Sequence, residues 1–205
     1  MNATLKLLSG APWSAKFGIV VILGYAFVAI FAPVLTPYGE TEIVGAEFEL
    51  WGEEFILGTD SLGRDMLTRL IYGARNTIGI AFLTTALAFL LGSITGFLAA
   101  AISGWVDQLL SRIVDVLMAI PALIFGLLVL TIVGTSIMNM VLVIAVLEST
   151  RVFRLARAVA MGVVVMDYVE AARLRGEGLW WIMSREVLPN ALPPLVAEFG
   201  LRFCF

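Results

Sequence analysis

Long apolar runs without charge alternate along this chain with short segments rich in charged residues. A helix needs about 20 mainly apolar residues to cross the hydrocarbon core of a bilayer. Residues 17–35 and 78–102 carry no charge, and residues 113–133 carry only Asp115. The pattern therefore predicts three membrane spans. Pro121 predicts a kink within the third span, because proline removes a helical hydrogen bond.

Two further stretches are apolar but carry charges. Residues 137–157 begin with eleven uncharged positions and then run through Glu148 and three arginines. Residues 187–205 contain three prolines, Glu198 and Arg202, and are still apolar at the last residue. We interpret the first stretch as a fourth span whose charged end emerges at the headgroups. We interpret the second as an incomplete fifth span in a chain truncated at its C-terminus.

The composition supports a membrane protein and excludes other classes. Of the 205 residues, 60% are hydrophobic and 14% are charged, whereas an average soluble domain has about 25% charged residues. The mean hydropathy is +1.00. The absence of histidine and the single cysteine, Cys204, exclude a disulfide framework and a Cys/His zinc site. The sequence therefore predicts an all-α polytopic membrane protein with one domain, residues 1–205.

Charges outside the predicted spans indicate the orientation in the membrane. Residues 38–54 contain six glutamates and no lysine or arginine, whereas residues 151–185 contain six arginines. Lys and Arg are enriched in short cytoplasmic loops. We therefore expect the loop 158–189 and the N-terminus to lie in the cytoplasm, and the loop 36–77 to lie outside.

The predicted cytoplasmic loop carries the signals of two short helices. Asp167 suits a helix N-cap, and Glu170 follows three residues later, as in a capping box. Gly176 suits the left-handed conformation that ends many helices. A second helix should run from Leu179 toward Pro189, whose ring disfavours helix at the preceding residue. A two-turn helix is not stable alone in water, so the element should dock on something. A plain connecting loop folded back on the bundle is the alternative.

Small residues recur at helical spacing in the second predicted span, at Gly92 and Gly96. In lipid, such residues let helix backbones approach closely. We expect the two glycines to serve helix packing. A direct role in lining a pore is the alternative.

A polar segment of the predicted outer loop precedes the second span and contains Gly58, Thr59, Asp60, Gly63, Arg64 and Asp65. Its two aspartates could form a catalytic pair, but no nucleophile, histidine or set of metal ligands accompanies them. Threonine, serine and aspartate suit helix caps. We therefore expect Thr59, Asp60 and Ser61 to cap a helix and the segment to shape the outer face.

Glu148 has two interpretations, because an acid inside a membrane is by default a functional candidate. It could couple transport to protons, or it could form an ion pair with Arg151, three residues on. We favour the ion pair, because no histidine or second acid is available nearby to relay protons.

The chain lacks the Gly-x-x-x-x-Gly-Lys-[Ser/Thr] loop that cradles nucleotide phosphates, since Lys6 and Lys16 are the only lysines. If transport is driven by ATP, the ATPase must therefore be another polypeptide.

The predicted cytoplasmic loop contains a set of residues that resembles the EAA signature of ABC importer permeases: Glu170, Ala171, Ala172, Gly176, Val187, Leu188 and Pro189. In that family isoleucine is usual at the position of Val187. Residues 57–75, 115–121 and 188–192 are similar to motifs of the dipeptide/oligopeptide/nickel branch. The resemblance covers nearly the whole chain, from about residue 17 to residue 195.

The resemblance implies a permease subunit, not an enzyme, of an ATP-driven importer for peptides or related small solutes in the prokaryotic plasma (inner) membrane. It implies that an ATPase docks on Glu170, Ala171, Ala172, Gly176, Leu188 and Pro189. The implied partners are a homologous second permease, two cytoplasmic ATPases that hold ATP and Mg, an extracytoplasmic solute-binding protein and the lipid bilayer, but no nucleic acid. A complete member would have six spans, continuing beyond Leu195.

Two other functions stay open from the residues. A secondary transporter driven by an ion gradient would need Glu148 or Asp115 and no ATPase. A non-transporting membrane assembly protein would show no solute-dependent ATP hydrolysis.

Overall fold

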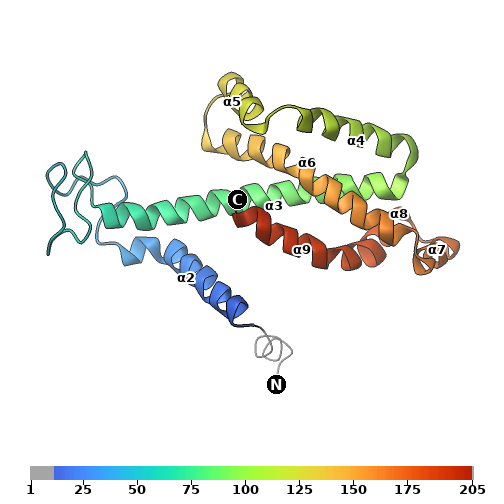
Figure 1. The fold of residues 1–205 in the computed structure, drawn as a ribbon, viewed down its shortest axis with the longest axis horizontal. Coiled ribbons are helices and arrows are strands. Elements are labelled where there is room, and N and C mark those ends of the chain that lie inside the picture. The colour runs from blue at the N-terminus through green and yellow to red at the C-terminus, as the bar shows by residue number, and fades with distance from the viewer. Residues whose placement is uncertain (1–11, 205) are drawn as a thin grey trace. The chain divides into compact units, whose positions relative to one another are not determined.

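The computed structural model describes residues 12–204, and the regular elements of that part of the chain are helices (Figure 1). In chain order these are α2 (Trp13–Leu35), α3 (Met66–Ile102), α4 (Gly104–Ala119), α5 (Ala122–Val133), α6 (Ile137–Val164), α7 (Asp167–Leu174), α8 (Leu179–Ile182), the π-helical turn η1 (Met183–Val187) and α9 (Leu188–Cys204). The all-helical architecture is as predicted. The chain divides into two compact units at Ile80 and Ala81, and each is described by itself.

Two described helices, α2 and α3, are long and apolar enough to cross a membrane, and the bent pair α4 and α5 makes a third if it is one span. These helices contain the first two predicted spans, 17–35 and 78–102. α6 contains the predicted span 137–157 but carries four charged residues from Glu148 onward. The crossings by α6 and α9, and the cytoplasmic N-terminus with Lys6, which lies outside the described residues, stay predictions.

The third predicted span is broken, not kinked. α4 ends at Ala119, Ile120 has an extended backbone with ψ 132°, and α5 begins directly after Pro121. The two helices meet at an angle of 92°. The expectation of one kinked helix over 113–133 is therefore wrong, because proline disfavours helical geometry at the residue before it.

In the first unit, α2 keeps nearly all of its apolar surface open. Only Ala29 and Ala32 are buried along its 23 residues. The helix ends at Thr36, whose backbone N–H donates to the carbonyl of Ala32 over 3.2 Å. A helix that is apolar all round suits contact with lipid or with other membrane helices.

In the second unit, one apolar cluster joins the long helices to the short ones that follow α6. Its buried members come from α3, α6, α7, α8, η1 and α9: Phe97, Ala100, Ala156, Ala160, Val163, Val169, Ala172, Ile182, Met183, Val187, Ala191 and Leu195. The short helices are therefore packed on the bundle instead of standing alone, which a helix of two turns requires.

The C-terminal half of α3 approaches α6 at its glycines. A Cβ atom added at Gly92 would lie 2.6 Å from the carbonyl oxygen of Ser149, and one added at Gly96 would lie 2.7 Å from that of Phe153. Backbone atoms at that distance leave no room for any side chain. Small residues permit this close approach of two helix backbones.

Two ion pairs tie α4 to α6. Arg157 donates to both carboxylate oxygens of Asp107, over 2.6 Å from Nη2 to Oδ2. Arg154 donates to Asp115 over 2.8 Å. The Asp107 pair is the more buried, with side chains 30% and 20% exposed, against 55% and 50% for the Asp115 pair.

The chain stays helical through Leu188 and Pro189, which corrects the expected helix end before the proline. The preceding turn η1 is widened, and the Leu188 N–H donates to the carbonyl of Met183, five residues back. π-helical structure is rare and occurs mostly as single turns inside α-helices. Here the π turn ends two residues before Pro189. In a regular helix the proline ring clashes with the carbonyl four residues back.

Candidate functional site

The motif residues Glu170, Ala171 and Ala172 lie on the helix α7. Its N-cap is Met166, with an extended backbone and no side-chain hydrogen bond to the cap. The expected capping box is therefore wrong, because Asp167 is already the first helical residue. Asp167 and Glu170 instead place two negative charges in the first turn, where the helix dipole stabilises them.

α7 has one buried face and one exposed face. Val169 and Ala172 are fully buried in the apolar cluster of the second unit. Glu170 and Ala171 are exposed. The apolar side of α7 is thus used by the chain's own bundle, which holds the helix against α6 and α8.

Gly176 ends α7 in the left-handed conformation, with φ +82°, as predicted. The Gly176 N–H donates to the carbonyl of Arg173 over 2.9 Å, and the Glu177 N–H donates to that of Ala172 over 3.2 Å. This pair of bonds is the Schellman motif, which satisfies the last carbonyls of a helix. A residue other than glycine at this φ is strained, so the motif fixes the turn between α7 and α8.

The surface around this turn combines large exposed apolar side chains with charged ones. Val165 is 79% exposed, Leu174 83% and Trp180 79%. The guanidinium of Arg175 lies 6.0 Å from the centre of the Trp181 ring, within cation–π range. Large apolar side chains in such exposure mark an interaction surface.

Leu188 and Pro189, the remaining motif residues of this part of the chain, lie in the first turn of α9. Both are exposed. Their neighbours Val187 and Ala191 are fully buried in the same apolar cluster as Ala172. The two parts of the motif, on α7 and at the start of α9, are therefore joined through one apolar core.

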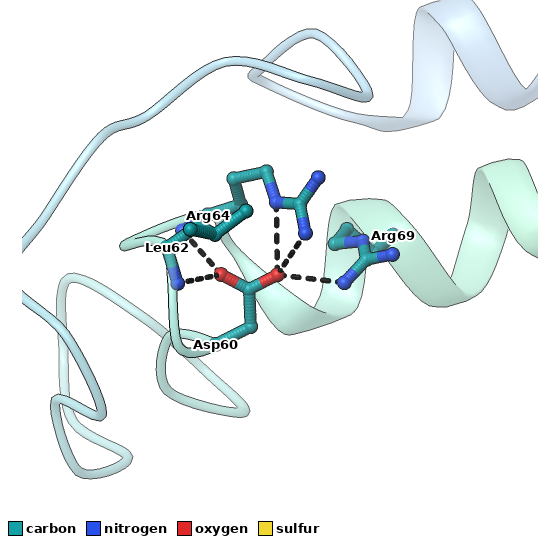
Figure 2. A network of polar contacts seen from close by, with 4 residues as sticks. All are labelled: Asp60, Leu62, Arg64 and Arg69. Atoms are coloured by element: carbon teal, nitrogen blue, oxygen red, sulfur yellow. Dashed lines mark hydrogen bonds and ion pairs between the residues drawn. The ribbon is translucent and has the colours of Figure 1, made fainter.

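The second set of motif residues shapes the loop that leads into α3. The Asp60 carboxylate accepts hydrogen bonds from the backbone N–H groups of Leu62 and Arg64, over 2.8 Å and 3.0 Å, and from two guanidinium groups (Figure 2). Arg64 Nε lies 2.8 Å from Asp60 and Arg69 Nη1 lies 2.6 Å from it. Burial acts to raise the pKa of Asp60, but the hydrogen bonds from Arg64, Leu62 and Arg69 outweigh it and hold this pKa far below its ordinary value.

Two glycines of this segment are required by close backbone contacts. Gly58 and Gly63 have φ +74° and +70°, and a Cβ atom would lie 2.3 Å from the Glu49 carbonyl oxygen at the first and 2.2 Å from that of Gly45 at the second. The Thr59 hydroxyl donates to the Ala46 carbonyl over 2.6 Å. The segment thus holds the middle of the 36–65 loop in place.

The cap of α3 is Asp65, whose carboxylate accepts from the Thr68 N–H over 2.8 Å. This corrects the expectation that Thr59, Asp60 and Ser61 cap the helix. Thr59 bonds to the loop and Asp60 to the loop and Arg69, and the sequence signal for the true cap was Asp65 itself, directly before the apolar helix. Among residues 12–204, no group of three His, Cys, Asp or Glu side chains is arranged to hold a metal ion.

Comparison with known proteins defines the class. The family model described as "Binding-protein-dependent transport system inner membrane component" matches residues 92–205. This chain belongs to that family, and its class is therefore that of inner-membrane transport permeases.

Individual relatives within the family show which transport proteins this chain resembles. The chain is 36% identical to the di/tripeptide transport system permease protein DppC of Pseudomonas aeruginosa, over 91% of this chain and 64% of the relative. It is 33% identical to the dipeptide transport system permease protein DppC of Haemophilus influenzae, over 91% and 66%. It is 37% identical to the Escherichia coli protein of that name, over 92% of this chain and 65% of the relative. The chain thus spans slightly under two thirds of the length of these three relatives.

Proposed function

We propose that this chain is the permease subunit of an ATP-driven importer for peptides or related small solutes, and that a separate ATPase docks on α7 and α8. The observation that supports this proposal is the two-sided burial of α7. Val169 and Ala172 attach it to the membrane bundle, while Glu170 and Ala171 face outward. One face is thus held by the bundle, and the other is available to a partner.

The same arrangement suits the transmission of movement. The apolar cluster makes α7, η1 and the first turns of α9 one packed body with α6, and packed cores move as units instead of deforming continuously. Closure of an ATPase dimer on α7 would therefore displace these helices together. Alternating access follows if the closed ATPase binds one arrangement of the helices better than the other.

The relatives support a peptide-type cargo. The names of the similar permeases specify dipeptide or di/tripeptide transport. We therefore propose that this permease, in its plasma membrane, carries small solutes with the charged termini of peptides.

The proposed assembly has three kinds of protein partner. A homologous second permease would complete the pathway within the bilayer, and two cytoplasmic ATPases would carry ATP and Mg, because Lys6 and Lys16 are the only lysines and no phosphate-binding loop is present. An extracytoplasmic binding protein would meet the loop between α2 and α3. There Phe48, Leu50 and Trp51 are 70%, 84% and 81% exposed.

Crosslinking tests the docking of the ATPase. In the full-length permease with Cys204→Ser, Ala171→Cys should crosslink to a co-expressed ATPase subunit, because Ala171 is exposed. Ala172→Cys is the matched control, since its side chain is fully buried and should not react. Crosslinks from Ala171 only to the permease's own helices would contradict the proposal.

Mutation of the motif separates coupling from assembly. Glu170→Lys and Gly176→Asp should abolish solute uptake while leaving membrane insertion intact. Unchanged uptake in both variants would contradict a coupling role. Uptake that persists without any ATPase, and that is lost on Glu148→Gln, would favour a transporter driven by an ion gradient.

A further inference from the structure

α9 has an aromatic face that fixes its position in the second unit. The ring of Phe199 lies 5.1 Å from that of Phe89 and 6.2 Å from that of Phe82, and the Phe203 ring lies 6.4 Å from Phe82. All three pairs are edge-to-face, a preferred aromatic geometry. Phe199 and Phe203, one helical turn apart, therefore press this side of α9 against α3.

An adjacent face of α9 carries charges that meet α6. Arg202 Nε donates to Glu198 over 2.8 Å, and Arg202 Nη1 donates to Glu148 on α6 over 3.4 Å. Arg151 Nη1 lies 3.9 Å from Glu148. Two anions and two cations thus form one network between the helices, which we call the α6–α9 charge cluster (Glu148, Arg151, Glu198 and Arg202).

Glu148 lies far from either end of α6, whereas Arg202 lies near the end of α9. Glu148 follows eleven uncharged residues of α6, or roughly 16 Å at 1.5 Å per residue. In the proposed topology this depth is near the middle of a hydrocarbon core of about 30 Å. Charged side chains at such depth face protein or water instead of lipid.

The cluster is not sealed from solvent, and Glu148 is not tightly paired within it. The side chains of Arg202, Glu148 and Arg151 remain 23%, 33% and 51% exposed. Within residues 12–204, the ion-pair contacts of Glu148 are the two long ones with Arg151 and Arg202, whereas close charge-assisted bonds are about 2.7–2.9 Å. By contrast, the Asp115–Arg154 pair that ties α4 to α6 is close, at 2.8 Å. Glu148 and Arg202 can therefore exchange their mutual contact for a ligand.

We propose that Glu148 and Arg202 form a polar subsite on the solute path, where Glu148 receives the ammonium group and Arg202 the carboxylate of a zwitterionic, peptide-like solute. This inference rests on the proposed function. Glu198 acts as a positioning residue, because its 2.8 Å bond orients the Arg202 guanidinium. The subsite has no net charge, which matches a solute with one charge of each sign.

Charge exchange distinguishes a solute subsite from a structural staple. In the full-length permease, reconstituted with its ATPases and binding protein, the fourfold variant Glu148→Arg, Arg151→Glu, Glu198→Arg and Arg202→Glu keeps every pair of the cluster but reverses its polarity. We expect ATP-driven uptake of L-alanyl-L-alanine to fall by at least about tenfold, as for the loss of a desolvated charge contact, while the assembled complex is recovered at the normal yield. The matched control is the same exchange at Asp115 and Arg154, a pair between α4 and α6 at 2.8 Å, which should retain uptake.

Accessibility gives a second measurement that does not depend on turnover. With Cys204 replaced by serine, Glu148→Cys should react with a membrane-impermeant cationic methanethiosulfonate, and L-alanyl-L-alanine with the binding protein should slow that reaction. Val196→Cys, on the apolar and 64% exposed surface of α9, is the control and should not react.

The outcomes separate the two proposals. Full uptake in the fourfold exchange, or labelling of Glu148→Cys that the dipeptide does not slow, overturns the subsite and leaves the importer proposal standing. Failure of the unmodified complex to take up the dipeptide with ATP counts against the proposed function itself.

Discussion

The backbone N–H of Glu177 donates a hydrogen bond to the carbonyl of Ala172, across the left-handed turn at Gly176. This bond joins the end of α7 to a residue whose side chain is fully buried in the bundle. The direction in which the chain leaves α7 is therefore tied to the packing of the membrane helices.

Gly176→Ala should weaken this turn. The substitution meets no atom within 4 Å, so its cost comes from the positive φ and amounts to about 1–2 kcal/mol. We expect faster amide hydrogen exchange at the end of α7 and a several-fold loss of solute-stimulated ATP hydrolysis in the assembled transporter. Gly178→Ala is the control, because Gly178 has φ −72° and the same open surroundings. Equal effects of the two substitutions would contradict the role of the turn.

Gly92→Ala should separate α3 from α6. The new Cβ would lie 2.6 Å from both the Ser149 carbonyl oxygen and the Val152 Cβ, and relief of such overpacking costs about 1–3 kcal/mol. Thermal unfolding in detergent should show a lower midpoint. Gly79→Ala, on the same helix with nothing within 4 Å, should be neutral or slightly stabilising, since alanine favours helix over glycine. A stable Gly92→Ala variant would mean that the two helices are not in close contact.

The Asp60 network predicts how the loop before α3 responds to acid. Because the pKa of Asp60 in the folded chain lies far below its ordinary value, the stabilisation from its charged form is present above the pKa of the unfolded chain. It is lost only as the pH falls through the folded pKa. Proteolysis of the loop should therefore stay slow well below pH 4.

Asp60→Asn should remove that acid tolerance. The variant keeps the size of the side chain but loses the ion pairs with Arg64 and Arg69, so the loop should be cleaved faster at neutral pH. Glu53→Gln, at an exposed position of the same loop, provides the control. Equal cleavage rates for Asp60→Asn and the unmodified chain would show that the network does not hold the loop.

The two ion pairs between α4 and α6 should differ in strength. Asp107→Asn removes the bidentate partner of Arg157 in a half-buried setting and should lower the free energy of unfolding by about 1–3 kcal/mol. Asp115→Asn disrupts a pair that is about half exposed and should cost about 0–1 kcal/mol. Denaturation of both variants in the same detergent measures the difference, and a larger effect at Asp115 would reverse the assignment.

The sequence predicted those features correctly that depend on one local property of the chain. The uncharged runs predicted α2 and α3, since length and hydropathy alone decide whether a helix can span a bilayer. Gly176 was predicted as a helix end because few other residues adopt positive φ. The family was identified from the EAA-like residues together with motifs elsewhere along the chain.

The errors arose where two local rules compete. Asp167 and Glu170 fit a capping box, but packing of Val169 and Ala172 sets α7 so that Met166 becomes the cap. Both Pro121 and Pro189 discourage helix before them, yet the helix breaks at the first and continues through a π turn at the second. Local sequence does not distinguish these outcomes, because the neighbouring helices determine which backbone path is packed.

The order of residues by itself determined that this chain is a helical membrane protein of the inner-membrane transport component family, because hydropathy, charge bias and short motifs are properties of contiguous segments. Only the tertiary structure decided that Ala172 faces inward while Ala171 faces outward, and that Arg202 reaches Glu148 fifty-four residues away. Such relationships depend on how helices rotate and cross when their apolar faces are buried together, and no local pattern encodes that rotation.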